Sequence, residues 1–108
     1  MAFVAMDVAM QMARGLGDVV RRIETRDRSL ADQVRRAASS VVLNLAEGRQ
    51  RSGRDRIHLF RIARGSAAEV RAAVELAIAW GYVPASALET QLGLQDRLAG
   101  LLYGLTRG

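Results

Sequence analysis

Apolar residues recur every three or four positions along nearly the whole chain, which is the spacing of one face of an α-helix. No segment keeps the two-residue alternation of a half-buried strand, and no Asn-Gly hairpin signal occurs. The helical pattern is interrupted around residues 25–29, 48–53 and 81–84, so four segments are joined by short loops. The sequence therefore predicts an all-α fold, an antiparallel up-down four-helix bundle. Its 108 residues are expected to form one domain, residues 1–108.

Residues that favour helix ends set the expected boundaries. Ser29 is a good N-cap for the second helix, and Gly48 is well placed to end that helix in the left-handed conformation. Ser52 is expected to cap the third helix, and Gly81 is expected to end it. Pro84 suits the first turn of the fourth helix. The apolar face of that last helix is expected to consist of Leu88, Leu92, Leu98, Leu101, Leu102 and Leu105.

The first helix carries two apolar seams rather than one. The seam expected to face the bundle core consists of Ala5, Ala9, Met12, Leu16, Val19 and Ile23. The second seam, rotated around the same helix, consists of Phe3, Met6, Met10, Ala13, Gly17 and Val20. Soluble monomers seldom leave such a stripe exposed. The second seam therefore predicts a contact with another subunit, through Phe3, Met6 and Met10.

Small residues are concentrated in the middle of the second and third helices. Residues 37–40 (Ala-Ala-Ser-Ser) can face residues 65–68 (Gly-Ser-Ala-Ala). A glycine inside a helix costs about 1 kcal/mol relative to alanine, so Gly65 needs a compensating gain. We expect Gly65 to mark a close crossing of these two helices.

The positive charge is concentrated in one segment. All 16 basic residues are arginines, whose planar guanidinium group suits phosphate and carboxylate. Residues 49–64 hold six arginines and one acid, which equals the whole formal charge of +5, because the remainder has ten arginines and ten acids. The six are Arg49, Arg51, Arg54, Arg56, Arg61 and Arg64.

Two functional interpretations of this arginine segment remain open beside that of an ordinary solvated face. It can bind the phosphates of RNA or DNA without strong sequence specificity, since no base-reading motif is present. Alternatively, it belongs to a protein-interaction scaffold whose basic face meets an acidic partner protein. In a ring the segment would repeat once per subunit, and weak contacts would add.

Four polar residues stand one helical turn apart in two pairs, Asn44 with Glu47 and Ser66 with Glu69. Paired carboxylates can perform acid–base chemistry or bind a metal. The favoured interpretation is a structural polar network that fixes helix register.

Little in the chain suggests catalysis. There is no cysteine, so disulfides, thiolate metal sites and cysteine nucleophiles are excluded. His58 is the only histidine and lacks the partners that zinc needs. We therefore expect no enzyme, no metal and no cofactor. The lack of an apolar run of about 20 residues predicts no membrane span, and we expect a soluble, cytoplasmic protein.

The polar and small residues between Gln33 and Tyr82 resemble a known pattern. The sequence is similar to the bacterial four-helix-bundle family of ribosomal RNA intervening-sequence proteins at Gln33, Arg35, Arg36, Ala37, Ser40, Asn44, Ala46, Glu47, Gly48, Arg51, Phe60, Ile62, Ala63, Gly65, Ser66, Glu69, Gly81 and Tyr82. The resemblance implies a ring-shaped homo-oligomer, with a pentamer as the expected form, and no known enzymatic activity.

Two further implications follow from this resemblance. The family is distantly similar to the accessory proteins of diversity-generating retroelements, which are basic pentamers that bind RNA and a reverse transcriptase. That similarity is an analogy for nucleic-acid binding. Val42 stands where the family usually has proline, and Leu43 replaces a small residue. These departures imply a straighter second helix.

Overall fold

Four α-helices make up most of the part of the protein that the structure describes. The computed structural model describes residues 2–107. Its elements are α1 (Val4–Glu24), α2 (Arg28–Arg49), α3 (Gly53–Ala79), a short 3-10 helix η1 (Ala85–Leu88) and α4 (Glu89–Thr106). No strand occurs within the described residues. The prediction of an all-α, four-helix fold is confirmed.

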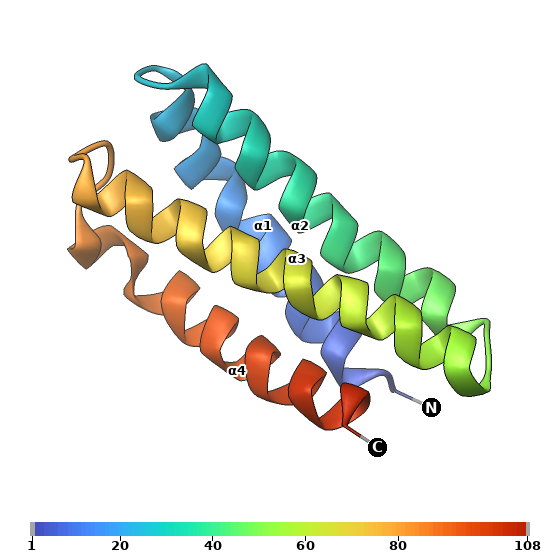
Figure 1. Ribbon diagram of the computed structural model, residues 1–108. Helices are drawn as coiled ribbons and strands as arrows, with labels where there is room; N and C mark the ends of the chain where they lie inside the picture. Colours follow the sequence, from blue (N-terminus) through green and yellow to red (C-terminus); the bar gives the residue numbers. More distant parts are fainter. Residues whose placement is uncertain (1, 108) are drawn as a thin grey trace.

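The helices form an elongated bundle of 42 × 23 × 21 Å. Contacts join α1 to α2, α2 to α3, α3 to α4 and α4 back to α1. Figure 1 shows the start of α1, the α2–α3 turn and the end of α4 at one end of the bundle, with the other two connections at the opposite end. We call the former the arginine end, because it includes the arginine segment between residues 49 and 64.

The core follows the predicted periodicity. All six residues of the first seam of α1 are buried, together with Val34, Val41 and Leu45 of α2 and Val70 and Val74 of α3. Each large aliphatic side chain removed from water contributes about 1.5–3 kcal/mol. On α4, Leu98 and Leu102 are fully buried, whereas Leu92, Leu101 and Leu105 are only partly buried.

The α1–α2 connection has a different cap from the one predicted. The Asp27 carboxylate Oδ1 accepts a hydrogen bond from the Leu30 backbone N–H at 2.9 Å. Asp27 is therefore the N-cap of α2, and Ser29 lies inside the first turn. Both residue types favour this position, but the negative charge of aspartate also interacts favourably with the helix dipole.

The prediction that Gly48 ends α2 in the left-handed conformation was also wrong. α2 continues through Gly48 to Arg49, and the left-handed glycine is Gly53, with φ 59°. Ser52 is the N-cap of α3 by position, without a side-chain hydrogen bond to the helix. Gly48 is instead buried inside α2, where it has a packing role.

The prediction that α2 and α3 approach closely at Gly65 was wrong, because the close approach is at Gly48. A Cβ atom on Gly48 would lie 2.6 Å from Cε1 of Phe60. A Cβ on Gly65 would meet no atom within 4 Å, and Gly65 is exposed. The neighbouring residue Ser66 faces α2 instead, because its hydroxyl lies 2.7 Å from that of Ser40.

The end of α3 follows the prediction. Gly81 has φ 76°, its N–H donates to the Ile78 carbonyl at 3.0 Å, and the Tyr82 N–H donates to the Ala77 carbonyl at 2.9 Å. This is the bond pair of a Schellman motif. Pro84 then precedes η1 rather than α4, so α4 begins at Glu89. The 3-10 turn forms because the Ala87 N–H reaches the Pro84 carbonyl, three residues back.

Candidate nucleic-acid interface

The six arginines predicted as a site are all exposed and occupy the α2–α3 turn and the first turns of α3. The C-terminus of α2 and that of α4 lie at the same end of the bundle (Figure 1). Helix C-termini expose unpaired carbonyls with partial negative charge, which attract cations. This arrangement explains the position of several arginines before any ligand is invoked.

Arg56 completes the end of α2. Its Nε donates to the Gly48 carbonyl and its Nη2 donates to the Arg49 carbonyl, each at 3.2 Å. The Arg49 guanidinium lies 5.0 Å from the centroid of the Phe3 ring, a cation–π contact. The Phe3 ring in turn lies 5.9 Å from the Phe60 ring. The turn is thus held by its own arginines.

Arg61 and Arg64 reach the end of α4. Nη2 of Arg61 donates to the Thr106 carbonyl at 3.4 Å, and Nη1 of Arg64 lies 3.3 Å from the Thr106 hydroxyl. The Arg64 guanidinium also lies 5.0 Å from the centroid of the Tyr103 ring. These contacts use only some of the five N–H donors of each guanidinium, so both remain able to bind an anion.

The two carboxylates beside the α2–α3 turn, Glu47 and Asp55, are both paired with one arginine. Arg51 lies 2.9 Å from Glu47 and 4.0 Å from Asp55. Arg49, Arg54, Arg56, Arg61 and Arg64 form no ion pair with an acid among residues 2–107. We call these five residues the arginine face.

Arg71, the next arginine along α3, does not extend this face. Arg71 is partly buried and binds Glu75 at 2.7 Å and Asp96 at 2.5 Å. The hydrogen bond with Glu75 is the main cause that raises the pKa of Arg71. Its positive charge is therefore compensated between α3 and α4, and the face ends at Arg64.

The predicted polar network is smaller than expected and includes a residue that the prediction omitted. Nδ2 of Asn44 donates to the Ser40 carbonyl at 2.8 Å and lies 3.1 Å from the Ser40 hydroxyl, which contacts Ser66. Glu47 lies outside this cluster because it pairs with Arg51 at the surface. Glu69 is exposed and also lies outside it. The cluster links α2 to α3.

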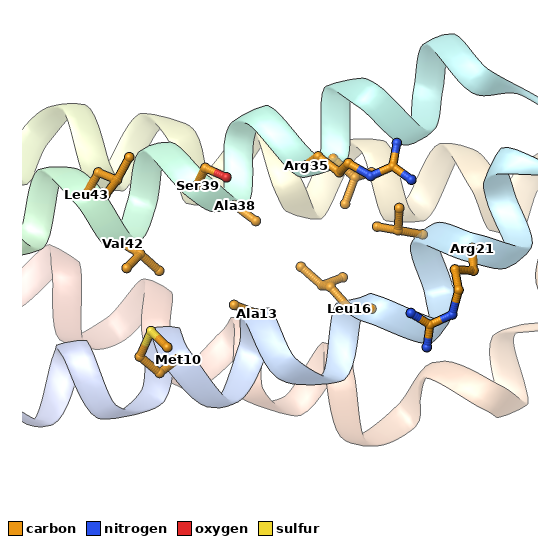
Figure 2. A pocket seen from close by; sticks show the side chains of 12 residues that line it. Met10, Ala13, Leu16, Arg21, Arg35, Ala38, Ser39, Val42 and Leu43 are labelled. Atoms are coloured by element: carbon orange, nitrogen blue, oxygen red, sulfur yellow. The ribbon is translucent and has the colours of Figure 1, made fainter.

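The second seam of α1 borders an apolar groove of about 520 Å³ between α1 and α2 (Figure 2). Met10 and Ala13 line it from α1, and Val42 and Leu43 line it from α2. Leu43 is 66% exposed. α2 is continuous through Val42, so the groove is bordered by an unbroken helix.

The other two proposed interface residues, Phe3 and Met6, are partly buried against the core of the same chain. Arg21 and Arg35 stand at one end of the groove (Figure 2). The side chain of Arg35 donates a hydrogen bond to Glu24 at 2.6 Å, and this bond is the main cause that raises the pKa of Arg35. The groove is therefore apolar along most of its length, and the charged side chains stand at one end, where Arg35 is paired with an acid.

A second hollow, of about 410 Å³, lies between α3 and α4. Its lining includes the polar residues Arg64, Arg71, Gln95, Asp96 and Tyr103 beside three alanines. Sequence reasoning did not identify this site, because it is assembled from side chains on two helices that are far apart in sequence.

Two buried glutamines connect this hollow to α1. Nε2 of Gln95 donates to Oε1 of Gln91 at 3.0 Å, and Nε2 of Gln91 donates to the Met12 carbonyl at 3.2 Å. Since a carbonyl only accepts, Met12 sets the orientation of both amides. This series of hydrogen bonds ends at Oε1 of Gln95, which receives no hydrogen bond from a donor within the described part of the protein. An unpaired buried acceptor costs about 1–3 kcal/mol.

The spacing of α4 contained a signal for these glutamines. The buried positions of α4 are Gln91, Gln95, Leu98, Leu102 and Thr106, which step by three or four residues. Reading only the leucines hid the two polar members of the same face.

At the opposite end of the bundle, a side-chain contact links the α1–α2 turn to the end of α3. The Tyr82 hydroxyl donates to Oδ2 of Asp27 at 3.2 Å, and the Arg26 guanidinium lies 5.8 Å from the Tyr82 ring centroid. The pKa of Tyr82 is raised mainly because the phenol is partly removed from solvent, and to a smaller extent because it donates a hydrogen bond to Asp27. This contact gives the Gly-Tyr pair of the sequence pattern a structural role.

Residues 2–107 contain no group of three or more His, Cys, Asp or Glu side chains that could hold a metal ion. Across the same residues, every helix falls short of the length and apolar character that a membrane span requires.

Comparisons with known proteins identify the family. The family model of the 23S rRNA-intervening sequence protein matches residues 3–104. The fold is similar to the crystal structure of a protein of unknown function from the S23 ribosomal protein family of Bacteroides thetaiotaomicron. The TM-score is 0.86 at 20% sequence identity, and the match covers 96% of this chain and 99% of that chain. A search of curated proteins finds no match. The resemblance inferred from the sequence is confirmed: the chain belongs to the 23S rRNA-intervening sequence protein family.

Proposed function

We propose that this protein is a non-catalytic, cytoplasmic adaptor that binds RNA or DNA through the arginine face. The observation that carries the proposal is the gathering of five arginines at one end of the bundle, without an acidic partner among residues 2–107. Guanidinium groups bind phosphate oxygens in pairs. Contacts to phosphate carry no sequence information, so affinity is expected to be similar across sequences.

We further propose that the bundle, in antiparallel up-down order, assembles into a ring-shaped homo-oligomer, with a pentamer as the expected form. The half-buried second seam of α1 and the exposed Leu43 support this assembly, because a neighbouring subunit would cover both. A ring repeats the arginine face once per subunit. Weak phosphate contacts on one long nucleic acid would then reinforce each other through avidity.

The test compares two triple variants with the same loss of charge. In the first, Arg49, Arg54 and Arg61 of the arginine face become glutamine. In the control, the same change is made at the exposed residues Arg22, Arg28 and Arg36, which lie outside that face. Fluorescence anisotropy with unrelated single-stranded oligonucleotides, measured between low and physiological salt, gives the affinity and its salt dependence.

The first variant should weaken binding alike for all sequences and lower the salt slope by about 2, since each single-strand phosphate contact contributes about 0.7. The control should change both quantities much less. Equal losses in both variants would contradict a localised face, and no binding by the wild-type protein at low salt would reject the function.

The alternative function is a protein-interaction scaffold whose basic face meets an acidic partner. The Arg51–Glu47 pair shows that a guanidinium group of this region can bind a carboxylate. Binding to polyglutamate with no binding to oligonucleotides under the same salt conditions would favour this alternative.

A further inference from the structure

The hollow between α3 and α4 has the dimensions and polarity of a small ligand site. Its volume of about 410 Å³ falls within the range of about 300–1,000 Å³ that is usual for such sites. Ala68 and Ala99 are among the residues that line it. Small side chains at these two positions leave room for a planar group.

One wall of the hollow is rich in hydrogen-bond acceptors. Gln95 is only 5% exposed, and its Oε1 has no hydrogen-bond donor among residues 2–107. Asp96 and Glu75 line the same hollow, and Arg71 binds both carboxylates. A ligand that completes this wall must present N–H or O–H donors.

The opposite end offers an aromatic ring and a cation. Tyr103 is 51% exposed, with the Arg64 guanidinium 5.0 Å from its ring centroid. Arg64 also belongs to the arginine face, so the hollow is continuous with the proposed phosphate-binding surface. Donors at one edge, a flat ring and an adjacent phosphate are together the features of a nucleotide.

We propose that this hollow binds an unstacked nucleobase of a single strand, guanine in preference to uracil. The base lies against Tyr103, its phosphate contacts Arg64, and its donor edge faces Gln95 and Asp96. Guanine carries adjacent donors at N1 and N2, whereas the single N–H of uracil lies between two carbonyls that the acceptor wall repels. Protein sites for single-stranded RNA commonly stack bases on aromatic rings and read their edges. The inference rests on the proposed function and adds a preference for single strands to it.

The test begins with the mononucleotides GMP and UMP and with inorganic phosphate as probes of the intact protein. Side-chain amide signals in ¹⁵N–¹H NMR spectra report directly on Gln95. GMP should shift these signals and bind about tenfold or more tightly than UMP, and phosphate alone should leave the Gln95 signals in place. Equal binding of GMP and UMP would overturn the proposal.

Two variants localise the site. Ala99→Phe fills the hollow from an exposed position, and Tyr103→Ala removes the ring. Each should weaken binding of a guanine-containing single strand about tenfold, as expected for the loss of one stacked base, and leave binding of a duplex of the same sequence unchanged. Ala72→Phe, at an exposed position that does not line the hollow, and Tyr103→Phe, which keeps the ring, should behave as the wild-type protein.

The failures of the two proposals are distinguishable. Single-strand binding that resists Ala99→Phe but falls in the arginine triple variant would overturn the base site and retain the proposed function. GMP binding without oligonucleotide binding would point to a free nucleotide and overturn the assignment to a single strand. Circular dichroism of both variants verifies that the helices are intact.

Discussion

The two sides of α2 pack in opposite ways. Toward α3, Gly48 admits the edge of the Phe60 ring, and the Ser40 and Ser66 hydroxyls meet at 2.7 Å. Toward α1, the helices border a groove of about 520 Å³, and Leu43 remains 66% exposed. The difference indicates that the α2–α3 contact is complete within one chain. The α1–α2 contact leaves apolar surface that the chain itself does not cover.

The largest expected effect concerns the open side. Replacing Met6 and Met10 with glutamate places two charges where we propose that a neighbouring subunit packs. Both methionines are already partly buried in the monomer, so we take the lower limit of about 1.5 kcal/mol for each, or about 3 kcal/mol per contact. The molar mass from light scattering should fall toward that of a monomer while circular dichroism remains helical.

A matched control for this prediction lies on the outer surface of the same helix. Gln11→Glu and Arg14→Gln lower the charge by the same amount as the two methionine substitutions and alter two exposed residues of α1 outside both apolar seams, so the assembly should persist. A wild-type protein that is monomeric at micromolar concentration would defeat the prediction, and with it the proposed ring.

The next effect breaks the closed side. Gly48→Val adds a branched side chain where a Cβ alone would lie 2.6 Å from the Phe60 ring. Overpacking of this kind costs about 1–3 kcal/mol, although valine is the better helix former. Urea unfolding should show a lower midpoint for the variant. An unchanged midpoint would mean that Phe60 rotates away freely and that the contact is looser than the structure indicates.

A smaller effect of opposite sign is expected at Gly65. Because a Cβ there meets no atom within 4 Å, Gly65→Ala should gain the helix propensity of alanine, about 1 kcal/mol at most. The unfolding midpoint should rise. A loss of stability comparable to that of Gly48→Val would show that Gly65 also packs closely, for example against another subunit.

These two glycines also show what the sequence alone can predict. Helix number, the core seam of α1 and the Schellman end at Gly81 follow from periodicity and local backbone chemistry, which act within a few residues. Gly48 satisfied the rule for a helix end, but its position is determined by Phe60, twelve residues later. A local rule cannot distinguish a glycine that ends a helix from one that admits a neighbouring ring.

The candidate site was predictable to a similar extent. The arginine segment is a feature of composition, so its exposure followed directly. Its internal contacts did not, because Arg61 and Arg64 reach Thr106 on another helix. Gln91 and Gln95 follow the spacing of the buried face of α4, but the hydrogen bond from Gln91 to Met12 of α1 does not follow from that spacing. Pairings between distant helices depend on the crossing geometry of the bundle, which the periodicity of one helix does not specify.

The smallest expected effect concerns the far end, where Asp27 links the open α1–α2 side to α3 through Tyr82. Burial and the hydrogen bond to Asp27 raise the pKa of Tyr82 above its ordinary value of about 10. The folded state therefore favours the neutral phenol. Its contribution to stability is fully present below about pH 10 and is lost as the pH rises through the higher folded pKa.

Tyr82→Phe keeps the ring and removes the hydroxyl, so the variant should be slightly less stable than the wild-type protein at pH 8. Because the phenol no longer titrates, the difference should shrink as the pH rises above 10. Urea unfolding at pH 8, 10 and 11 measures both stabilities, and Tyr103→Phe serves as the control at the other end of the bundle. A difference between Tyr82→Phe and the wild-type protein that stays constant up to pH 11 would show that the phenol–carboxylate bond does not hold this end closed. The α1–α2 side would then be held at this end by its buried core residues and by the bond between Arg35 and Glu24.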